Sequence, residues 1–221
     1  FGNAIHRILE LRVPGEPLAA QHALVRESLT HYDVSHRELT TEALAARLIP
    51  RLQAVLDADL ARAGVRLADL TSPALRAEME FNYALDGASL ARLRDACAQH
   101  GWPQLIPART QQLAGLMNGK IDLVFEHEGR FHILDWKGND LGDGNSACLE
   151  DYAPAALERK MDSTHYRFQA LLYTVAIDRY LRDRLGDAYD RARHLGDCWY
   201  LFVRATGLQL PDGTPCGVWR H

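Results

Sequence analysis

The sequence predicts an α/β protein in which helices flank a mixed central sheet. The clearest strand signal is the stretch 119–139, where two apolar runs are joined by a short polar turn at Gly129, a pattern typical of an antiparallel hairpin. A further apolar run, residues 197–204, predicts another core strand. Residues 2–11 and 163–185 carry the apolar spacing of helices. Strand and helix signals in one chain indicate this fold class.

Length and composition are those of one folded domain. The 221 residues are 47% hydrophobic and 24% charged, and no apolar stretch approaches the length that spans a bilayer. Because the sequence begins at Phe1, we expect a piece of a longer chain, folded as a single domain over residues 1–221. Four widely spaced cysteines without a C-x-x-C predict reduced thiols, as in a cytosol, rather than a zinc site. The net charge of −4 predicts weak DNA binding by this chain alone.

The amino-terminal part, residues 1–70, is expected to be mainly helical. In the helix predicted over residues 2–11, His6 lies beside the apolar stripe. A lone histidine in such a place is more often a partly buried packing residue than a ligand. Residues 18–64 continue the helical pattern, and Gly64 is the expected end of its last helix.

The expected core, residues 75–205, opens with the alternating segment 75–85. Glu78 and Glu80 share one face of this predicted strand, and apolar side chains occupy the other. The simplest interpretation is an edge strand with a solvated acidic side. The residues that follow the last predicted strand are expected to be irregular.

The predicted hairpin is unusual because it contains charges. Asp122 interrupts its first apolar run, and Asp135 and Lys137 end the second, on one face with Trp136 on the other. Converging carboxylates repel each other, and burying them costs free energy unless they are paired or bind a metal; oxygen ligands suit Mg²⁺ or Mn²⁺. A lysine beside such an ion can orient or activate water. For D-x-K alone a salt bridge is the commoner explanation, but the position of Asp122 and the following G-N favour a metal site.

One helix after the hairpin carries a polar stripe. Tyr166, Gln169 and Tyr173 stand at i, i+3 and i+7, which places them on one helical face. They would form either a half-buried polar seam or a row of hydrogen-bond donors toward a site. Arg167 could hold a DNA backbone, although a solvated surface position explains it equally well.

These motifs resemble a known family of nucleases. Asp122 followed by Asp135-Trp136-Lys137 resembles the core of the PD-(D/E)xK nuclease superfamily. GKIDLVF-x-HEGR-x-x-x-LDWKGN is similar to the nuclease domain at the C-terminal end of RecB-type helicase–nuclease subunits, which typically have G-x-IDLVF and LDYKSN. This chain differs by Trp136 in place of Tyr and Gly138 in place of Ser. The resemblance implies a restriction-endonuclease-like core, and the absence of helicase motifs from the sequence implies that any motor precedes it.

The resemblance also implies roles that the residue pattern leaves open. The family's G-x-x-x-H helix matches His6, its strand glutamate matches Glu78 with Glu80 as the second choice, and its Q-x-x-x-Y helix matches Gln169 and Tyr173. The implied catalytic residues are Lys137, Asp135, Asp122, Gln169 and Glu78; the implied metal ligands are His6, Asp122, Asp135 and the backbone carbonyl of Trp136; the implied DNA-binding residues are Tyr173, Tyr166 and Arg167.

The implied activity is Mg²⁺-dependent hydrolysis of DNA, with Mn²⁺ as a substitute, in bacterial double-strand-break repair and recombination. The implied substrate is single-stranded ends produced by an attached helicase, and the implied partners are that helicase and RecC- and RecD-like subunits in the cytoplasm. The alternative is an inactive nuclease-fold module that binds DNA or a partner. The full set of His6, Asp122, Asp135 and Lys137 argues against it, because a decayed site usually loses a ligand. A standalone phage or CRISPR-type nuclease commonly has a cysteine cluster for an iron–sulfur centre, which the scattered cysteines do not form.

Overall fold

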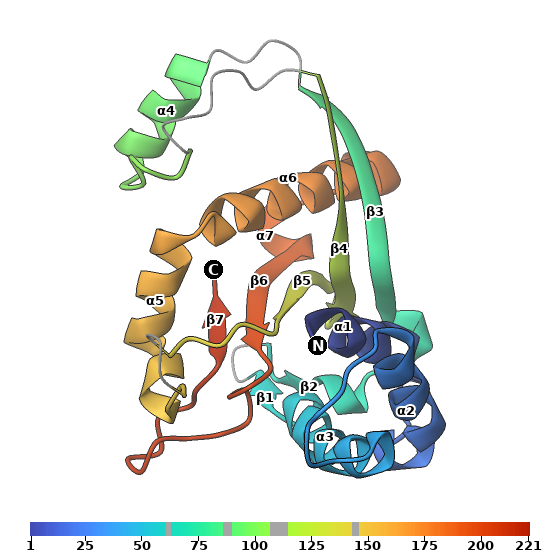
Figure 1. Cartoon of the computed structure of the whole chain (residues 1–221). Coiled ribbons are helices and arrows are strands. Elements are labelled where there is room, and N and C mark those ends of the chain that lie inside the picture. Colours follow the sequence, from blue (N-terminus) through green and yellow to red (C-terminus); the bar gives the residue numbers. More distant parts are fainter. Residues whose placement is uncertain (61–62, 86–89, 107–114, 143–145) are drawn as a thin grey trace.

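The computed structural model describes residues 1–60, 63–85, 90–106, 115–142 and 146–221, and its centre is a mixed five-stranded sheet (Figure 1). The strands lie in the order β3-β4-β5-β6-β7, with β5 and β6 parallel and the other neighbours antiparallel. Their bounds are β3 Leu75–Leu85, β4 Gly115–His127, β5 Arg130–Lys137, β6 Leu195–Phe202 and β7 Val218–Arg220. The predicted α/β class with a mixed sheet is confirmed.

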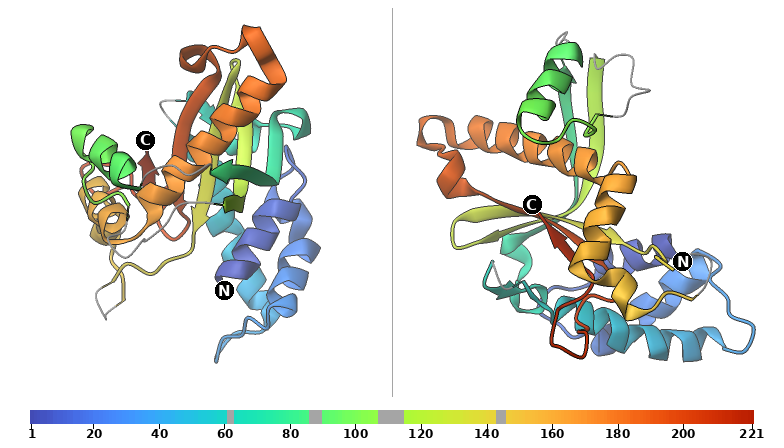
Figure 2. Two further views of the ribbon diagram at one scale, coloured as in Figure 1. Left: turned by 90° about the horizontal axis from the view of Figure 1, so that it is seen from above. Right: turned by 90° about the vertical axis from the view of Figure 1, so that its left-hand side faces the viewer.

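Helices cover both faces of the sheet (Figure 2). The α-helices are α1 Gly2–Leu11, α2 His22–His31, α3 Thr41–Leu56, α4 Leu90–Gln99, α5 Pro154–Ser163, α6 Tyr166–Leu185 and α7 Arg191–His194. Short 3-10 helices are Leu18–Gln21, Leu67–Asp69, Ser72–Ala74, Leu149–Tyr152 and Gly186–Ala188. None of these described helices is long and apolar enough to cross a membrane.

The two hydrophobic cores follow from strand alternation. Along β6, Trp199 packs against α1, α2 and α3, whereas Cys198 and Tyr200 pack against α5 and α6. Successive side chains of a strand point to opposite faces, so a continuous apolar run is buried on both sides. The sheet is therefore the middle layer of three, and α1 and α6 approach its central strands from opposite faces.

Two expectations about element ends are wrong. The last helix of the amino-terminal part ends at Leu56 rather than Gly64, because Leu60 and Val65 are buried in a small hairpin of β1 (Asp59–Leu60) and β2 (Val65–Arg66). Gly64, with φ of +68°, lies in the turn of that hairpin. The residues after β6 are also not irregular throughout, since β7 pairs with β6 and buries Trp219.

The predicted central hairpin is present as β4 and β5. Glu128 and Gly129 form its turn with φ of +50° and +77°, the left-handed pair that a tight hairpin requires. The turn sets a register in which Leu123 pairs with Leu134. Continuing the same register by one residue places Asp122 opposite Asp135.

The sheet splits at this point. Beyond Leu123, β4 no longer pairs with β5 but stays paired with β3, and the two strands run on as a ribbon past α6 (Figure 1). Ala77 packs against the core of α1 to α3, yet Met79, two residues later, packs against the α6 side. A regular strand would keep both on one face. Between them Glu78 has φ of +48°, so the backbone irregularity that turns the ribbon lies beside Asp122.

Candidate active site

The split in the sheet opens a pocket of about 430 Å³, which we call the acidic pocket. It is lined by most of the residues that the sequence singles out: His6, Asp122, Asp135, Trp136, Lys137, Tyr166, Gln169 and Tyr173. Three parts of the fold supply them, namely α1, the diverging ends of β4 and β5, and one face of α6. Residues that are more than 100 positions apart in the chain, such as His6 and Asp122, are thus brought together.

Asp122 lies between α1 and β5. Its Oδ2 accepts a hydrogen bond of 2.8 Å from the backbone N–H of Trp136 and is 3.4 Å from Nδ1 of His6. The hydrogen bond with Asp122 raises the pKa of His6, because it favours the protonated imidazole over the cost of burial. Without a metal ion, Asp122 therefore pairs with His6.

Glu78 also reaches this group. Ligand atoms of His6, Glu78 and Asp122 all lie within 4.8 Å of one another. Register explains this closeness, since Glu78 lies across from Asp122 between the paired positions on either side. Nζ of Lys120 lies between the two glutamates, 3.4 Å from Glu78 and 3.6 Å from Glu80. Of the two, Glu78 is the one that lies close to His6 and Asp122, and its role at the site stays a prediction.

Asp135 and Lys137 form a buried ion pair. Nζ of Lys137 is 2.5 Å from Oδ1 of Asp135, whose residue is 2% exposed. Burial raises the pKa of Asp135, the charge of Lys137 opposes this, and the negative charge of Asp122 adds to it. The salt bridge that the sequence left open as an alternative is thus present, but inside a pocket with further carboxylates.

Lys137 is held from its other side by α6 and β6. Its Nζ donates a hydrogen bond of 3.1 Å to Oε1 of Gln169 and lies 4.1 Å from the ring centre of Tyr166 and 5.0 Å from that of Tyr200. Gln169 in turn donates to the hydroxyl of Tyr173 at 2.8 Å. The ammonium group therefore has a fixed position, between a carboxylate, an amide oxygen and two aromatic faces.

Comparison with known proteins agrees with this geometry. Residues 1–211 match the PD-(D/E)XK nuclease superfamily. The chain belongs to this superfamily. It is 37% identical over 164 residues to the RecBCD enzyme subunit RecB of Escherichia coli K12, covering 73% of this chain and 14% of that protein. It is 32% identical to RecB of Mycolicibacterium smegmatis and 35% identical to RecB of Mycobacterium tuberculosis H37Rv, covering 99% of this chain and 22% of each relative.

These matches confirm the resemblance that the sequence motifs indicate. The chain spans only 14% to 22% of the length of these relatives. What the rest of such a protein does is therefore not carried by the residues described here.

The acidic pocket fits a divalent metal ion, the cofactor that nucleases of this superfamily use. One imidazole and two carboxylates lie close enough to share a divalent ion. Oδ1 of Asp135 is also buried beside this group, where the cation next to it is the ammonium group of Lys137 at 2.5 Å. The three residues whose ligand atoms lie closest to one another are His6, Glu78 and Asp122. Asp135 is not among them, and its carboxylate pairs with Lys137.

Arg167, like Glu80, lies outside the acidic pocket. Its guanidinium pairs with Glu158 and is 2.5 Å from Asp162, and it lines a different pocket on another face of α6. A role for Arg167 in DNA binding stays a prediction, and the acidic pocket would not be the place for it.

Tyr200 is a site residue that the sequence analysis missed. It is fully buried, its hydroxyl donates to Oε1 of Gln169 at 3.0 Å, and burial raises its pKa so that it stays protonated. Parallel pairing places Tyr200 beside Asp135. Alternation along residues 197–204 would have indicated its face, but not that its strand lies next to β5.

Proposed function

We propose that this chain is a DNA-cleaving domain that hydrolyses phosphodiester bonds with Mg²⁺, or with Mn²⁺ in its place. One observation carries the proposal: His6, Asp122, Asp135 and Lys137 converge in one pocket where β4 separates from β5. A decayed nuclease fold kept for binding would have no need of a buried lysine held by four separate groups.

His6, Asp122, Asp135 and the backbone carbonyl of Trp136 would hold the metal ion, with Glu78 as an additional carboxylate close to His6 and Asp122. When bound, the ion offsets the negative charge that develops on the phosphate oxygens and on the leaving oxygen. Holding a metal ion would require a neutral imidazole, so His6 would give up the proton that it shares with Asp122.

Lys137 would position the attacking water and donate a hydrogen bond to a phosphate oxygen. Its contacts with Asp135, Gln169 and Tyr166 prevent the long side chain from leaving the pocket, which lowers the entropy lost in the transition state. Tyr173 stands at the other end of the same hydrogen-bonded chain and would contact the DNA strand.

The wider setting is proposed from the relatives. Single-stranded ends delivered by a helicase part of the same protein would be the substrate, RecC- and RecD-like subunits the partners, recombinational repair the process, and the bacterial cytoplasm the location. The acidic net charge of −4 agrees with a domain that receives its DNA from elsewhere rather than capturing it.

The decisive experiment measures cleavage of a 5′-fluorescein single-stranded oligonucleotide by the 221-residue chain in Mn²⁺, Mg²⁺ or EDTA. We expect cutting with either metal and none in EDTA. Lys137→Ala should lower the rate by about 100-fold or more while Mn²⁺ binding, followed by calorimetry, persists. Lys160→Ala, which removes a lysine outside the acidic pocket, is the matched control.

Two results would contradict the proposal at different levels. Undiminished cutting by Lys137→Ala at saturating metal would remove Lys137 from the mechanism. Oligonucleotide binding by the wild-type chain without cleavage in any divalent metal would favour the inactive binding module.

A further inference from the structure

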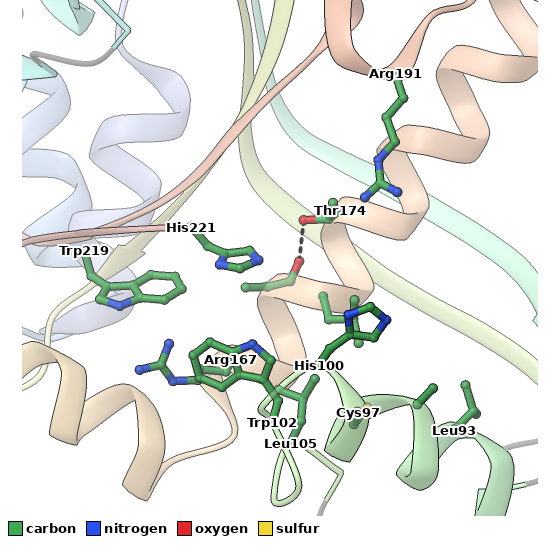
Figure 3. A pocket seen from close by; sticks show the side chains of 13 residues that line it. Leu93, Cys97, His100, Trp102, Leu105, Arg167, Thr174, Arg191, Trp219 and His221 are labelled. Atoms are coloured by element: carbon green, nitrogen blue, oxygen red, sulfur yellow. Dashed lines mark hydrogen bonds between the residues drawn. The ribbon is translucent and has the colours of Figure 1, made fainter.

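Figure 3 shows a second pocket, of about 580 Å³. The α6 residues that line it are different from those that line the acidic pocket. Its volume is within the range of roughly 300–1,000 Å³ typical of ligand sites. Side chains of α4, α6, α7 and β7 line it, together with the segment after α4 and the residue after β7. We call it the aromatic pocket, after its planar and basic side chains Trp102, Trp219, His100, His221, Arg167 and Arg191.

Flat rings form one wall of the aromatic pocket. Trp219 and His221 are stacked, with ring centres 6.2 Å apart and planes 6° from parallel, and Trp102 meets His221 edge-on at 6.4 Å. The guanidinium of Arg167 lies 4.3 Å from the centre of Trp102 and 5.3 Å from that of Trp219 (Figure 3). Trp219 is buried by the fold, but Trp102 is 36% exposed and presents free ring surface.

The charge of the wall is positive. None of the described lining residues is acidic, in a chain whose net charge is −4. The charge of Arg167 is compensated by Glu158 and Asp162, so it contributes a planar surface. Arg191 is different, because its side chain is 67% exposed and its contact with Asp178 is as long as 3.8 Å.

Planar rings for stacking next to a cation match the two parts of a nucleotide. Bases stack on aromatic side chains whatever their sequence, and an exposed arginine attracts phosphate. Residues of α6 line both pockets: Gln169 faces the acidic pocket, and Ala170, the next residue, faces the aromatic one. A ligand in the aromatic pocket would therefore be separated from the proposed cutting site by α6.

We propose that the aromatic pocket binds bases of single-stranded DNA and serves as a second contact for the strand outside the cutting site. The inference rests on the proposed function for the identity of its ligand, but not on the metal site. Stacking on Trp102 supplies the affinity, and Arg191 contacts the neighbouring phosphate.

The test is DNA binding in EDTA, where cleavage cannot occur. Fluorescence anisotropy compares an oligothymidylate with an oligomer of the same length whose sugars carry no bases. The wild-type chain should bind the oligothymidylate at least about fivefold more tightly, which corresponds to about 1 kcal/mol for one stacked base. Trp102→Ala should abolish this preference and Trp102→Phe should retain most of it.

Two further variants keep the test independent of folding. Tyr32→Ala removes an exposed aromatic residue of similar accessibility outside the aromatic pocket and should change nothing. Arg191→Gln should weaken binding of both oligomers equally and reduce the salt dependence by about one phosphate contact.

The proposal is overturned if the wild-type chain binds both oligomers equally, or if Trp102→Ala binds like wild type while melting normally. These outcomes are separate from cleavage. A base preference that depends on Trp102 in a chain that never cuts DNA would support the aromatic pocket and reject the nuclease mechanism; cutting without the preference would do the reverse.

Discussion

Removing one buried hydroxyl, in Tyr200→Phe, tests how Lys137 is positioned. The Tyr200 hydroxyl donates to Oε1 of Gln169 at 3.0 Å and lies 3.2 Å from the carbonyl oxygen of Tyr166. Phenylalanine keeps the ring that faces Lys137, so the aromatic contact survives while the hydrogen bond is lost. The substitution therefore separates the polar from the aromatic support of the lysine.

The expected cost to stability is small. One net hydrogen bond contributes about 0.5–1.5 kcal/mol. Oε1 of Gln169 keeps a second donor, Nζ of Lys137, so it is not left unsatisfied. We expect Tyr200→Phe to lower the free energy of unfolding by about 1 kcal/mol in urea titrations performed in EDTA.

The expected cost to turnover is larger. Without the Tyr200 hydroxyl, Gln169 keeps its hydrogen bonds with Lys137 and Tyr173 but loses one of its three anchors, so Lys137 is positioned less precisely. If about 1.4 kcal/mol of transition-state stabilisation is lost, kcat falls about tenfold, with little change in KM because Lys137 keeps its charge. Steady-state cleavage of a fluorogenic single-stranded substrate in Mn²⁺ measures both constants.

Tyr189→Phe is the matched control. Tyr189 also donates one hydrogen bond, 2.7 Å to Asp178, but it lies outside the acidic pocket. It should lose similar stability and keep full kcat. The reasoning is refuted if Tyr200→Phe retains wild-type kcat, or if both variants lose turnover in proportion to their loss of stability.

Two further predictions concern the carboxylates. Asp122→Asn keeps an acceptor for the Trp136 N–H and relieves the repulsion between Asp122 and Asp135, but it loses the pair with His6. Because these effects oppose each other, the melting temperature of the variant in EDTA should stay within a few degrees of that of wild type. Added Mn²⁺ should raise the melting temperature of wild type by several degrees and that of the variant only slightly. If Asp122→Asn is instead strongly destabilised in EDTA, Asp122 is a structural carboxylate. Burial raises the pKa of Asp135 from 3.8 to about 6, so the folded state keeps a proton that the unfolded state releases. Metal-free stability should fall between pH 4 and pH 6, by up to roughly 3 kcal/mol in urea titrations, and Asp135→Asn should remove this slope.

Much of the site was readable in the sequence because it depends on local geometry. Alternation along one strand places Asp135 and Lys137 on the same face, and 3.6-residue periodicity places Gln169 and Tyr173 on one side of α6. The hairpin register also follows from its two-residue turn at Gly129. These relations span only a few residues and are set by backbone geometry alone.

Only the tertiary structure decided which of these faces meet. Tyr200 lies beside Asp135 because β6 pairs in parallel with β5, more than sixty residues away in the chain. Glu78 reaches His6 because β3 and β4 change their packing face together where the sheet splits. Trp102 meets His221 and the guanidinium of Arg167 although both lie far from it in the chain, and with Trp219 it lines one pocket. Periodicity indicates which side chains share a face of one element. Which elements become neighbours depends on burying both faces of the sheet at the same time, and this burial involves the whole chain.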